Sequence, residues 1–176
     1  MARKAYILII LSAVLLLSIL IYNGIRRKTS IIEEISTIPE FYFYDSIGNI
    51  VHQKELIRFN SPTVIFYFNS GCSLCKEEFY FIEKHLQEFK DAQLIFISTE
   101  DFEDIEPFAA EFNLWGKQRI HFLQDRELLF GSYFNLETVP STLVYDHEGG
   151  LLGAFKGMIA IKKIIQLVHD GSRKES

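Results

Sequence analysis

The sequence predicts an α/β domain built around a strand–helix–strand unit. Residues 64–68 and 93–98 are apolar runs without alternation, which is typical of strands buried on both faces of a parallel sheet. Between them, from Cys72 to about Lys90, apolar residues recur at steps of four and three, the pattern of an amphipathic helix. Two parallel strands joined by a helix form a βαβ unit, so we expect helices to flank a central sheet.

The chain has 176 residues and is 48% hydrophobic, which is enough for one domain with a sizeable core and an additional segment. We divide it by composition into four parts. They are an N-terminal membrane anchor with basic flanks (1–28), a tether (29–37), the α/β domain (38–169) and a polar tail expected to be disordered (170–176).

Residues 5–22 contain no charged side chain and are almost wholly aliphatic. As a helix, this segment would be about 27 Å long, which matches the hydrocarbon core of a bilayer. We favour an uncleaved single-pass anchor over a cleaved signal peptide, because residues 19–24 have no small-x-small cleavage pattern. Basic residues flank both ends in nearly equal number, so the orientation follows from the short N-terminal tail, which usually stays in the cytoplasm. The domain is therefore expected outside the cytoplasmic membrane, facing the periplasm or the cell exterior.

Charge is distributed unevenly along the chain. Five of the 18 basic residues precede residue 29, where no acid occurs, so residues 29–176 contain 13 basic and 23 acidic residues and have a formal net charge of −10. Because nucleic acid is a polyanion, this balance argues against a nucleic-acid partner. The bilayer, contacted through residues 5–22, is the first partner that the sequence predicts.

The predicted domain opens with a β-hairpin. Residues 38–44 predict a strand that is entered through Pro39, and residues 45–49 have the Asp, Gly and Asn of a turn. Residues 50–52 predict the short returning strand. A connector at 56–60 then leads to the first buried strand.

Five acids lie between Glu100 and Glu106, directly after the second buried strand. Such a cluster could ligate a cation, but an acidic helix N-terminus with Pro107 in its first turn is the simpler interpretation. The remaining elements follow in chain order. They are a strand at 121–123, a helix at 127–134, a strand at 142–145, a turn at 146–150, a strand at 151–155 and a closing helix at 159–168.

The only two cysteines of the chain, Cys72 and Cys75, lie at the mouth of the first helix of this unit. Cys72 is expected among unpaired backbone N–H groups at the positive end of the helix dipole, and both favour the reactive thiolate. Three residues on, Cys75 has turned onto the same side of the helix. The spacing therefore supports attack on a partner disulfide by Cys72, then release by Cys75 through a mixed disulfide.

The phase of the helix separates the two thiols. Cys75 belongs to the apolar stripe and should be shielded, whereas Cys72 precedes it and should be exposed. Glu78 borders the buried face, where a carboxyl group would have a raised pKa and could exchange protons with Cys75. The alternative for Glu78 is an ordinary solvated helix acid beside Glu77.

A lone C-x-x-C has other interpretations. Half of a zinc site would need two further cysteine or histidine ligands, but the chain has no third cysteine and its five histidines show no ligand-like pair spacing. Two inert buried thiols are a further alternative. A structural disulfide would close a loop of only two intervening residues and would stabilise little. We therefore expect a catalytic dithiol, with no metal and no cofactor.

Together these motifs resemble the thioredoxin fold, a central mixed sheet flanked by helices. The shared features cover about residues 38–169: C-x-x-C on the first helix after a buried strand, Val-Pro before a late strand, an Asp-x-x-Gly hairpin and a last helix. The N-terminal β-hairpin extension, with its own Asp-x-x-Gly turn at 45–48, and the predicted N-terminal transmembrane helix are similar to those of TlpA/ResA-like thiol-disulfide oxidoreductases. These proteins are tethered on the outer face of the bacterial inner membrane.

The resemblance implies roles for particular residues. Most X-Pro bonds are trans, so Pro140 alone does not predict a cis bond; the resemblance implies that Val139-Pro140 is a cis-proline turn facing the dithiol. It also implies that Cys72 attacks, Cys75 resolves and Glu78 tunes the pair. Substrate contacts are assigned to Val139, Pro140, Gly71 and Ser73. Gly71 and Leu74 stand where the family usually has Trp and Pro, which leaves the direction of electron flow open.

The leading hypothesis is a membrane-tethered thiol-disulfide oxidoreductase that reduces protein disulfides in an exported compartment. The resemblance implies recharging by an electron donor in or outside the membrane. One alternative is a thioredoxin-fold peroxidase, although Asn69 stands where a peroxidase has Thr before its reactive cysteine. The other is a copper-delivery or binding module, because thiolates suit Cu(I), although known carriers use a wider cysteine spacing.

Overall fold

The computed structural model describes residues 14–22, 35–58 and 60–173. The chain divides into two units, Met1–Glu34 and Ile35–Ser176. In the first unit residues 14–22 are helical, while residues 5–13 of the predicted anchor lie outside the described residues. Among the helices that the structure describes, none has the length and apolarity needed to cross a bilayer. The second unit begins at Ile35, slightly before the predicted domain boundary at residue 38.

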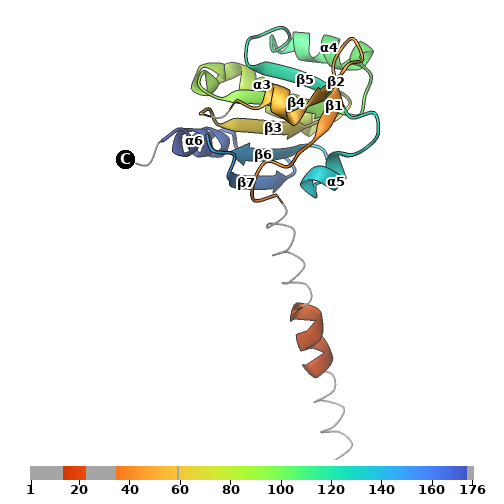
Figure 1. Cartoon of the computed structure of the whole chain (residues 1–176), viewed down its shortest axis with the longest axis vertical. Helices are drawn as coiled ribbons and strands as arrows, with labels where there is room; N and C mark the ends of the chain where they lie inside the picture. Colours follow the sequence, from red (N-terminus) through yellow and green to blue (C-terminus); the bar gives the residue numbers. More distant parts are fainter. Residues whose placement is uncertain (1–13, 23–34, 59, 174–176) are drawn as a thin grey trace, which may run out of the picture. The chain divides into compact units, whose positions relative to one another are not determined.

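The second unit is organised around a seven-stranded mixed sheet (Figure 1). In spatial order its strands are β2 (Ile50–His52), β1 (Tyr42–Tyr44), β5 (Ile120–Gln124), β4 (Gln93–Ser98), β3 (Thr63–Tyr67), β6 (Ser141–Tyr145) and β7 (Leu151–Lys156). The strands β3, β4 and β5 are parallel, and every other neighbouring pair is antiparallel. The predicted α/β class, the mixed sheet and the N-terminal hairpin are confirmed.

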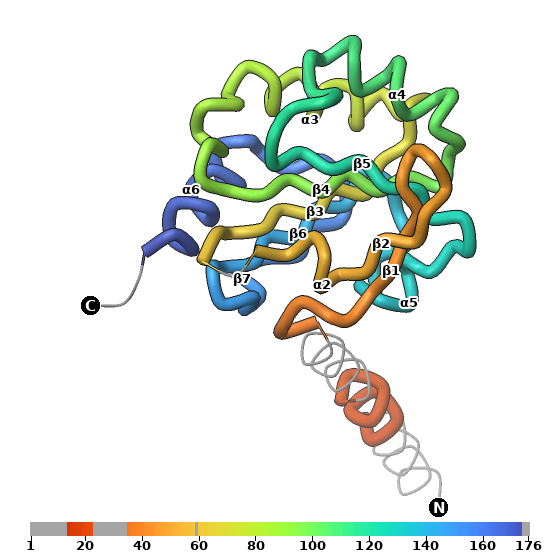
Figure 2. The backbone as a smooth tube through the Cα atoms, turned by 45° about the horizontal axis from the view of Figure 1, so that its top comes forward, coloured from red at the N-terminus to blue at the C-terminus, as the bar shows by residue number. Residues whose placement is uncertain are grey.

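Helices cover both faces of this sheet (Figure 2). They are α2 (Gln53–Leu56), α3 (Ser73–Lys84), the 3-10 helix η1 (Leu86–Phe89), α4 (Phe102–Glu111), α5 (Phe130–Phe134) and α6 (Ile161–Gly171). Side chains of α3, α4 and α6 share one hydrophobic cluster with the sheet, and those of α2 and α5 share the cluster on the other face. Because both faces are covered, the central strands are apolar without alternation, as the sequence predicted.

The two faces receive alternate residues of each central strand. Phe66, Phe96 and Phe122 lie in register on β3, β4 and β5, and their neighbouring rings stack with centroids 4.8 Å apart. This aromatic row supports the apolar face of α3, where Cys75 and Phe79 are completely buried. The helix that carries the dithiol is thus fixed against the most aromatic part of the core.

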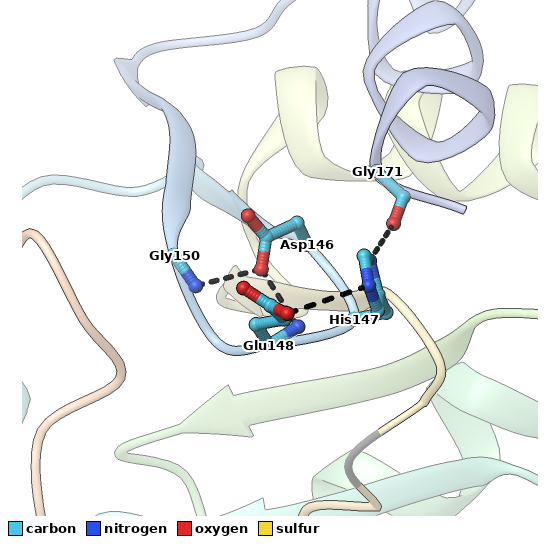
Figure 3. Close-up of polar contacts among 5 residues, drawn as sticks. All are labelled: Asp146, His147, Glu148, Gly150 and Gly171. Atoms are coloured by element: carbon cyan, nitrogen blue, oxygen red, sulfur yellow. Dashed lines mark hydrogen bonds and ion pairs between the residues drawn. The ribbon is translucent and has the colours of Figure 1, made fainter. Parts of the chain in front are cut away.

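The turn between β6 and β7 joins the beginning and the end of the domain. Figure 3 shows the contacts of Asp146 within the turn and of His147 with the end of α6. One carboxylate oxygen of Asp146 accepts the N–H groups of Glu148 and Gly150. The carbonyl of Gly171, at the end of α6, accepts the backbone N–H of His147 and lies 2.9 Å from its Nδ1. On the other side, the N–H of Ile38 donates to Gly149 and that of Leu151 to Ser36, so residues 36–38 run along the same turn.

Several boundaries differ from the prediction. The polar tail predicted from residue 170 is wrong at its start, because α6 continues to a buried Gly171 whose carbonyl is held by His147. Pro107 lies in the second turn of α4 rather than the first, since the helix is capped earlier, at Asp101. The connector predicted from residue 56 is preceded by a short helix, α2, because the side chain of Glu55 accepts the N–H of His52 in a capping box.

The helix predicted to reach Lys90 ends at Lys84. His85 leaves α-helical angles, its Nδ1 contacts the carbonyl of Phe81, and the chain continues as the 3-10 helix η1. The apolar stripe nevertheless continues through η1 to the buried Phe89. The side-chain pattern predicted the buried face correctly, but it did not show the change of helix type.

Candidate active site

The dithiol lies where β3 ends and α3 begins. Cys72 is the N-cap residue of α3, with extended backbone angles (φ −83°, ψ 119°). The N–H groups of a first helical turn have no intrahelical acceptor, and the Cys72 sulfur accepts one of them. The donor is the N–H of Cys75, with 3.2 Å between the nitrogen and Sγ. The helix therefore directs an N–H group at the sulfur that the sequence predicts to attack.

The two thiols differ in exposure, as the phase of the helix predicted. Cys72 is half-buried, whereas Cys75 is completely buried, and both are free thiols. Burial raises the pKa of the Cys75 thiol well above its usual range, and its hydrogen bond to Cys72 raises that pKa further. Cys72 is therefore accessible to a partner molecule, whereas Cys75 is shielded and its burial favours the protonated thiol.

Glu78 lies one helical turn beyond Cys75 and is only 2% exposed. Burial raises the pKa of its carboxyl group to about 7, although hydrogen bonds from the Thr142 hydroxyl and the Ile159 backbone lower it in part. The Thr142 hydroxyl donates to Oε1 over 3.1 Å. The prediction of a raised pKa is confirmed, and the alternative of a solvated acid is wrong. The negative charge of Glu78 also raises the pKa of the Cys75 thiol, so the two groups interact electrostatically.

Pro140 lies at the same end of the sheet as the dithiol. The peptide bond between Val139 and Pro140 is cis, as the resemblance implied. The next residue, Ser141, begins β6 and pairs with Tyr67, the last residue of β3. The Pro140 carbonyl accepts the N–H of Gly157 over 2.8 Å, which ties the turn to the end of β7. We call this end of the strands, where β3 ends and β6 begins, the dithiol end of the sheet.

The remaining predicted site residues also lie at the dithiol end. Gly71 and Ser73 flank Cys72 and are exposed. Val139 is 38% exposed, and Leu74, between the two cysteines, is 47% exposed. The structure thus brings every predicted site residue to one end of the sheet, where Leu74 and Val139 are exposed apolar side chains. A substrate contact by these residues stays a prediction.

Glu100 is a residue of this region that sequence reasoning assigned to a helix N-terminus. Its carboxylate instead accepts two hydrogen bonds from Ser70, two residues before Cys72. Thr142, which donates to Glu78, was also missed as a site residue. A signal for Glu100 existed in the topology, because residues that follow neighbouring parallel strands meet at one edge of the sheet.

Within the part of the chain that the structure describes, no group of three or more His, Cys, Asp or Glu side chains could hold a metal ion. The acidic run after β4 does not converge either, since Glu100 faces Ser70 while the side chain of Asp101 accepts a hydrogen bond from Gln124.

No protein-family model matches the sequence, and no curated protein matches it. Solved structures do match the fold. A secreted disulfide oxidoreductase of Mycobacterium tuberculosis, homologous to E. coli DsbE, is 15% identical with a TM-score of 0.62, over 78% of this chain and 98% of that chain. StoA from Bacillus subtilis is 12% identical with a TM-score of 0.57, over 75% of this chain and 98% of that one. Peroxidoxin BcpB from M. tuberculosis is 17% identical with a TM-score of 0.63, over 76% and 94%.

These comparisons define the class of the domain by its fold. It has a thioredoxin-like fold, which resembles the folds of a disulfide oxidoreductase, of StoA and of a peroxidoxin. The fold is therefore shared by proteins with different thiol chemistries, and the residues of the site must decide between those chemistries.

Proposed function

We propose that this protein is a thiol-disulfide oxidoreductase that reduces protein disulfides with the dithiol Cys72/Cys75. The observation that carries the proposal is the asymmetry of the pair. A half-buried sulfur at a helix N-cap accepts the N–H of the second cysteine, and that second thiol is completely buried. The first sulfur can attack a partner, and the second can act only within the protein.

The reaction has two exchange steps. The Cys72 thiolate attacks one sulfur of a substrate disulfide, which forms a mixed disulfide and releases the first substrate thiolate. The Cys75 thiol then loses its proton and attacks Cys72, which releases the second substrate thiolate and forms the Cys72–Cys75 disulfide. Each released thiolate takes up a proton, and two electrons have passed from the protein to the substrate. A reduced dithiol donor must then exchange with the Cys72–Cys75 disulfide to restore the reduced pair.

Glu78 supplies the proton acceptor that the second step needs. Cys75 has a raised pKa because it is buried, so it rarely ionises without a base beside it. The carboxyl group of Glu78 has a pKa of about 7, and its charged form can therefore take the Cys75 proton near neutral pH. Thr142 holds the carboxyl group in place across the gap between α3 and β6.

The proposal includes a surface for the substrate and a compartment. Exposed apolar side chains at Leu74 and Val139 lie at the same end of the sheet as Cys72, which suits a partly unfolded polypeptide that carries a disulfide. Gly71, Ser73 and Pro140 would contact the same segment.

The uncharged segment 5–22 supports a single-pass anchor in the cytoplasmic membrane, with the domain on the outer side, where its substrates would be exported proteins. Carbonate extraction of membranes tests the anchor. Protease treatment of intact cells, in a separate experiment, tests on which side of the membrane the domain lies.

Peroxide reduction is the second candidate, because a peroxidoxin shares the fold. The local structure disfavours it. The residue three positions before Cys72 is Asn69, whose side-chain oxygen accepts the N–H of Gly71 over 2.9 Å and so serves the turn itself. A peroxide at Cys72 would find no hydroxyl at that position.

Insulin reduction by dithiothreitol tests the proposed function. We expect the full chain in detergent to accelerate the reaction, and Cys72→Ser to lower the rate to that of dithiothreitol alone, because no attacking sulfur remains. Cys75→Ser should instead trap a mixed disulfide with insulin. Parallel assays of peroxide turnover and Cu(I) uptake separate the alternatives. A Cys72→Ser variant as active as the parent in insulin reduction would refute the proposal.

A further inference from the structure

The turn that carries Cys72 is held at two points. Within the turn, the Asn69 side chain accepts the N–H of Gly71, and the N–H of Cys72 donates to the Asn69 carbonyl over 3.1 Å. Ser70, between these contacts, is fastened to a different part of the chain. Its N–H and its hydroxyl group both donate to the carboxylate of Glu100, each over 2.7 Å, to Oε2 and Oε1 respectively.

Glu100 is itself held by the strand from which it emerges. β4 ends at Ser98, whose buried hydroxyl donates to Oε2 of Glu100 over 3.2 Å. The backbone N–H of Glu100 donates in turn to the Ser98 hydroxyl oxygen, also over 3.2 Å. β4 is the parallel neighbour of β3, and the N–H of Phe68 donates to Ile97 beside the turn. The carboxylate thus links the end of β4 to the turn that follows β3.

We infer that Glu100 is a positioning residue for the dithiol, an inference that rests on the proposed function. By fixing Ser70 at both its N–H and its hydroxyl, Glu100 sets the path of residues 70–72 and so the place of the Cys72 sulfur against the N–H of Cys75. Charge-assisted hydrogen bonds to a carboxylate are about twice as strong as neutral ones, so this two-point contact attaches the turn firmly to the end of β4.

If Glu100 positions the turn through its two hydrogen bonds to Ser70, then Glu100→Gln and Glu100→Ala should behave differently. The amide of Gln can accept the Ser70 N–H through its oxygen and donate to the Ser70 hydroxyl through its nitrogen, which preserves the two-point contact without the charge. Alanine removes both hydrogen bonds. A carboxylate that acted only by its charge would give the same result in the two variants.

The rate at which iodoacetamide alkylates Cys72 tests the inference, measured at neutral pH in a Cys75→Ser background of the full chain. We expect Glu100→Ala to lower the rate about tenfold, because the displaced Cys72 sulfur would lose its hydrogen bond from the N–H of Cys75, and Glu100→Gln to stay within about twofold of the parent. Glu103→Ala is the matched control, because Glu103 is an exposed acid in the first turn of α4, and it should leave the rate unchanged.

A parent-like rate in Glu100→Ala would overturn the inference, and so would a Glu100→Gln rate as low as that of Glu100→Ala. Should Glu100→Ala fail to fold by circular dichroism, Ser70→Ala gives the answer: it keeps the backbone hydrogen bond, loses the one to Oε1, and should slow alkylation about threefold. A Ser70→Ala rate equal to the parent's would count against the inference. Alkylation needs no disulfide substrate, so a parent that fails to reduce insulin would refute the proposed function without deciding the role of Glu100.

Discussion

The carboxyl group of Glu78 is buried on the same helix face as the Cys75 thiol. This burial has one consequence for chemistry and one for stability. The chemical consequence is proton exchange with Cys75 near neutral pH, as proposed above. The thermodynamic consequence follows from the same shift. The folded protein holds the Glu78 proton up to about pH 7, whereas an unfolded chain releases it near pH 4.5. The free energy of unfolding therefore decreases as the pH rises between these two values.

The parent protein should lose stability as the pH rises from about 4.5 to about 7, by about 3 kcal/mol from this group alone, and lose none from it below pH 4.5. Glu78→Gln cannot ionise and should lack this step. Urea unfolding at several pH values, followed by circular dichroism, measures it. Glu77→Gln is the matched control, because Glu77 is the exposed neighbour and its variant should keep the parent's step. Identical pH profiles for the parent and Glu78→Gln would contradict the expectation.

At the scale of single elements, α6 depends on its last residue. A Cβ atom at Gly171 would lie 2.7 Å from Cδ1 of Leu152 and 3.1 Å from the Cα of Asp146. The second of these neighbours belongs to the backbone of the β6–β7 turn, which is held by its own hydrogen bonds and cannot yield easily. The close approach of helix and turn therefore requires glycine here.

Gly171→Ala should destabilise the domain by about 1–2 kcal/mol, although alanine is ordinarily the better residue in a helix. Gly131→Ala, in α5, is the control. Its Cβ would meet only the flexible side chain of Glu137, at 3.0 Å, so this change should be neutral or slightly stabilising. Urea midpoints of the two variants decide the matter, and equal midpoints would show that the turn can yield.

The elements that sequence reasoning found are those with a strong repeating pattern. The buried strands and the apolar stripe of α3 were found because one side-chain period determines which residues face the core. The place of Cys75 and the raised pKa of Glu78 followed from the same period. A side-chain period contains no information about hydrogen bonds between residues that are distant in sequence. Such a hydrogen bond holds the end of α6, so the predicted end of that helix was wrong.

The residues of the candidate site differ in the same way: those close in sequence could be predicted, and those joined by distant contacts could not. The cysteines, and Glu78 with them, are close in sequence and share one helix, so their relation could be predicted. Glu100 and Thr142 join the site from β4 and β6 through contacts that only the order of the strands creates. The cis bond before Pro140 was available from resemblance and not from the residues, because an isolated X-Pro bond favours trans.

At the scale of the whole domain, residues 35–38 pack against the β6–β7 turn and the first residue of β7. Ile35 is 2% exposed within the core, and residues 36–38 form two backbone hydrogen bonds to residues 149–151. These residues precede the first strand, yet they belong to the same packed unit.

A chain shortened to begin at Pro39 should therefore be less stable than one that begins at Glu33, by about 3 kcal/mol, because it lacks a core isoleucine and two hydrogen bonds. Urea unfolding of the two chains measures the difference. Iodoacetamide alkylation of Cys72 should be equal in both chains, since the lost segment is remote from the sulfur. Matching urea midpoints would mean that residues 35–38 add nothing to the fold.

The antiparallel pairing of β6 with β3 puts Ser141 beside Tyr67 and Tyr145 beside Thr63, so the β6–β7 turn and the dithiol occupy opposite ends of the same strands. The chain reaches the domain at that turn, through residues 36–38. Ile35 therefore lies at the end of the domain opposite to the two cysteines. A biotin tag, a reporter protein or a solid support coupled ahead of this residue would leave the sulfur atoms free to meet their targets.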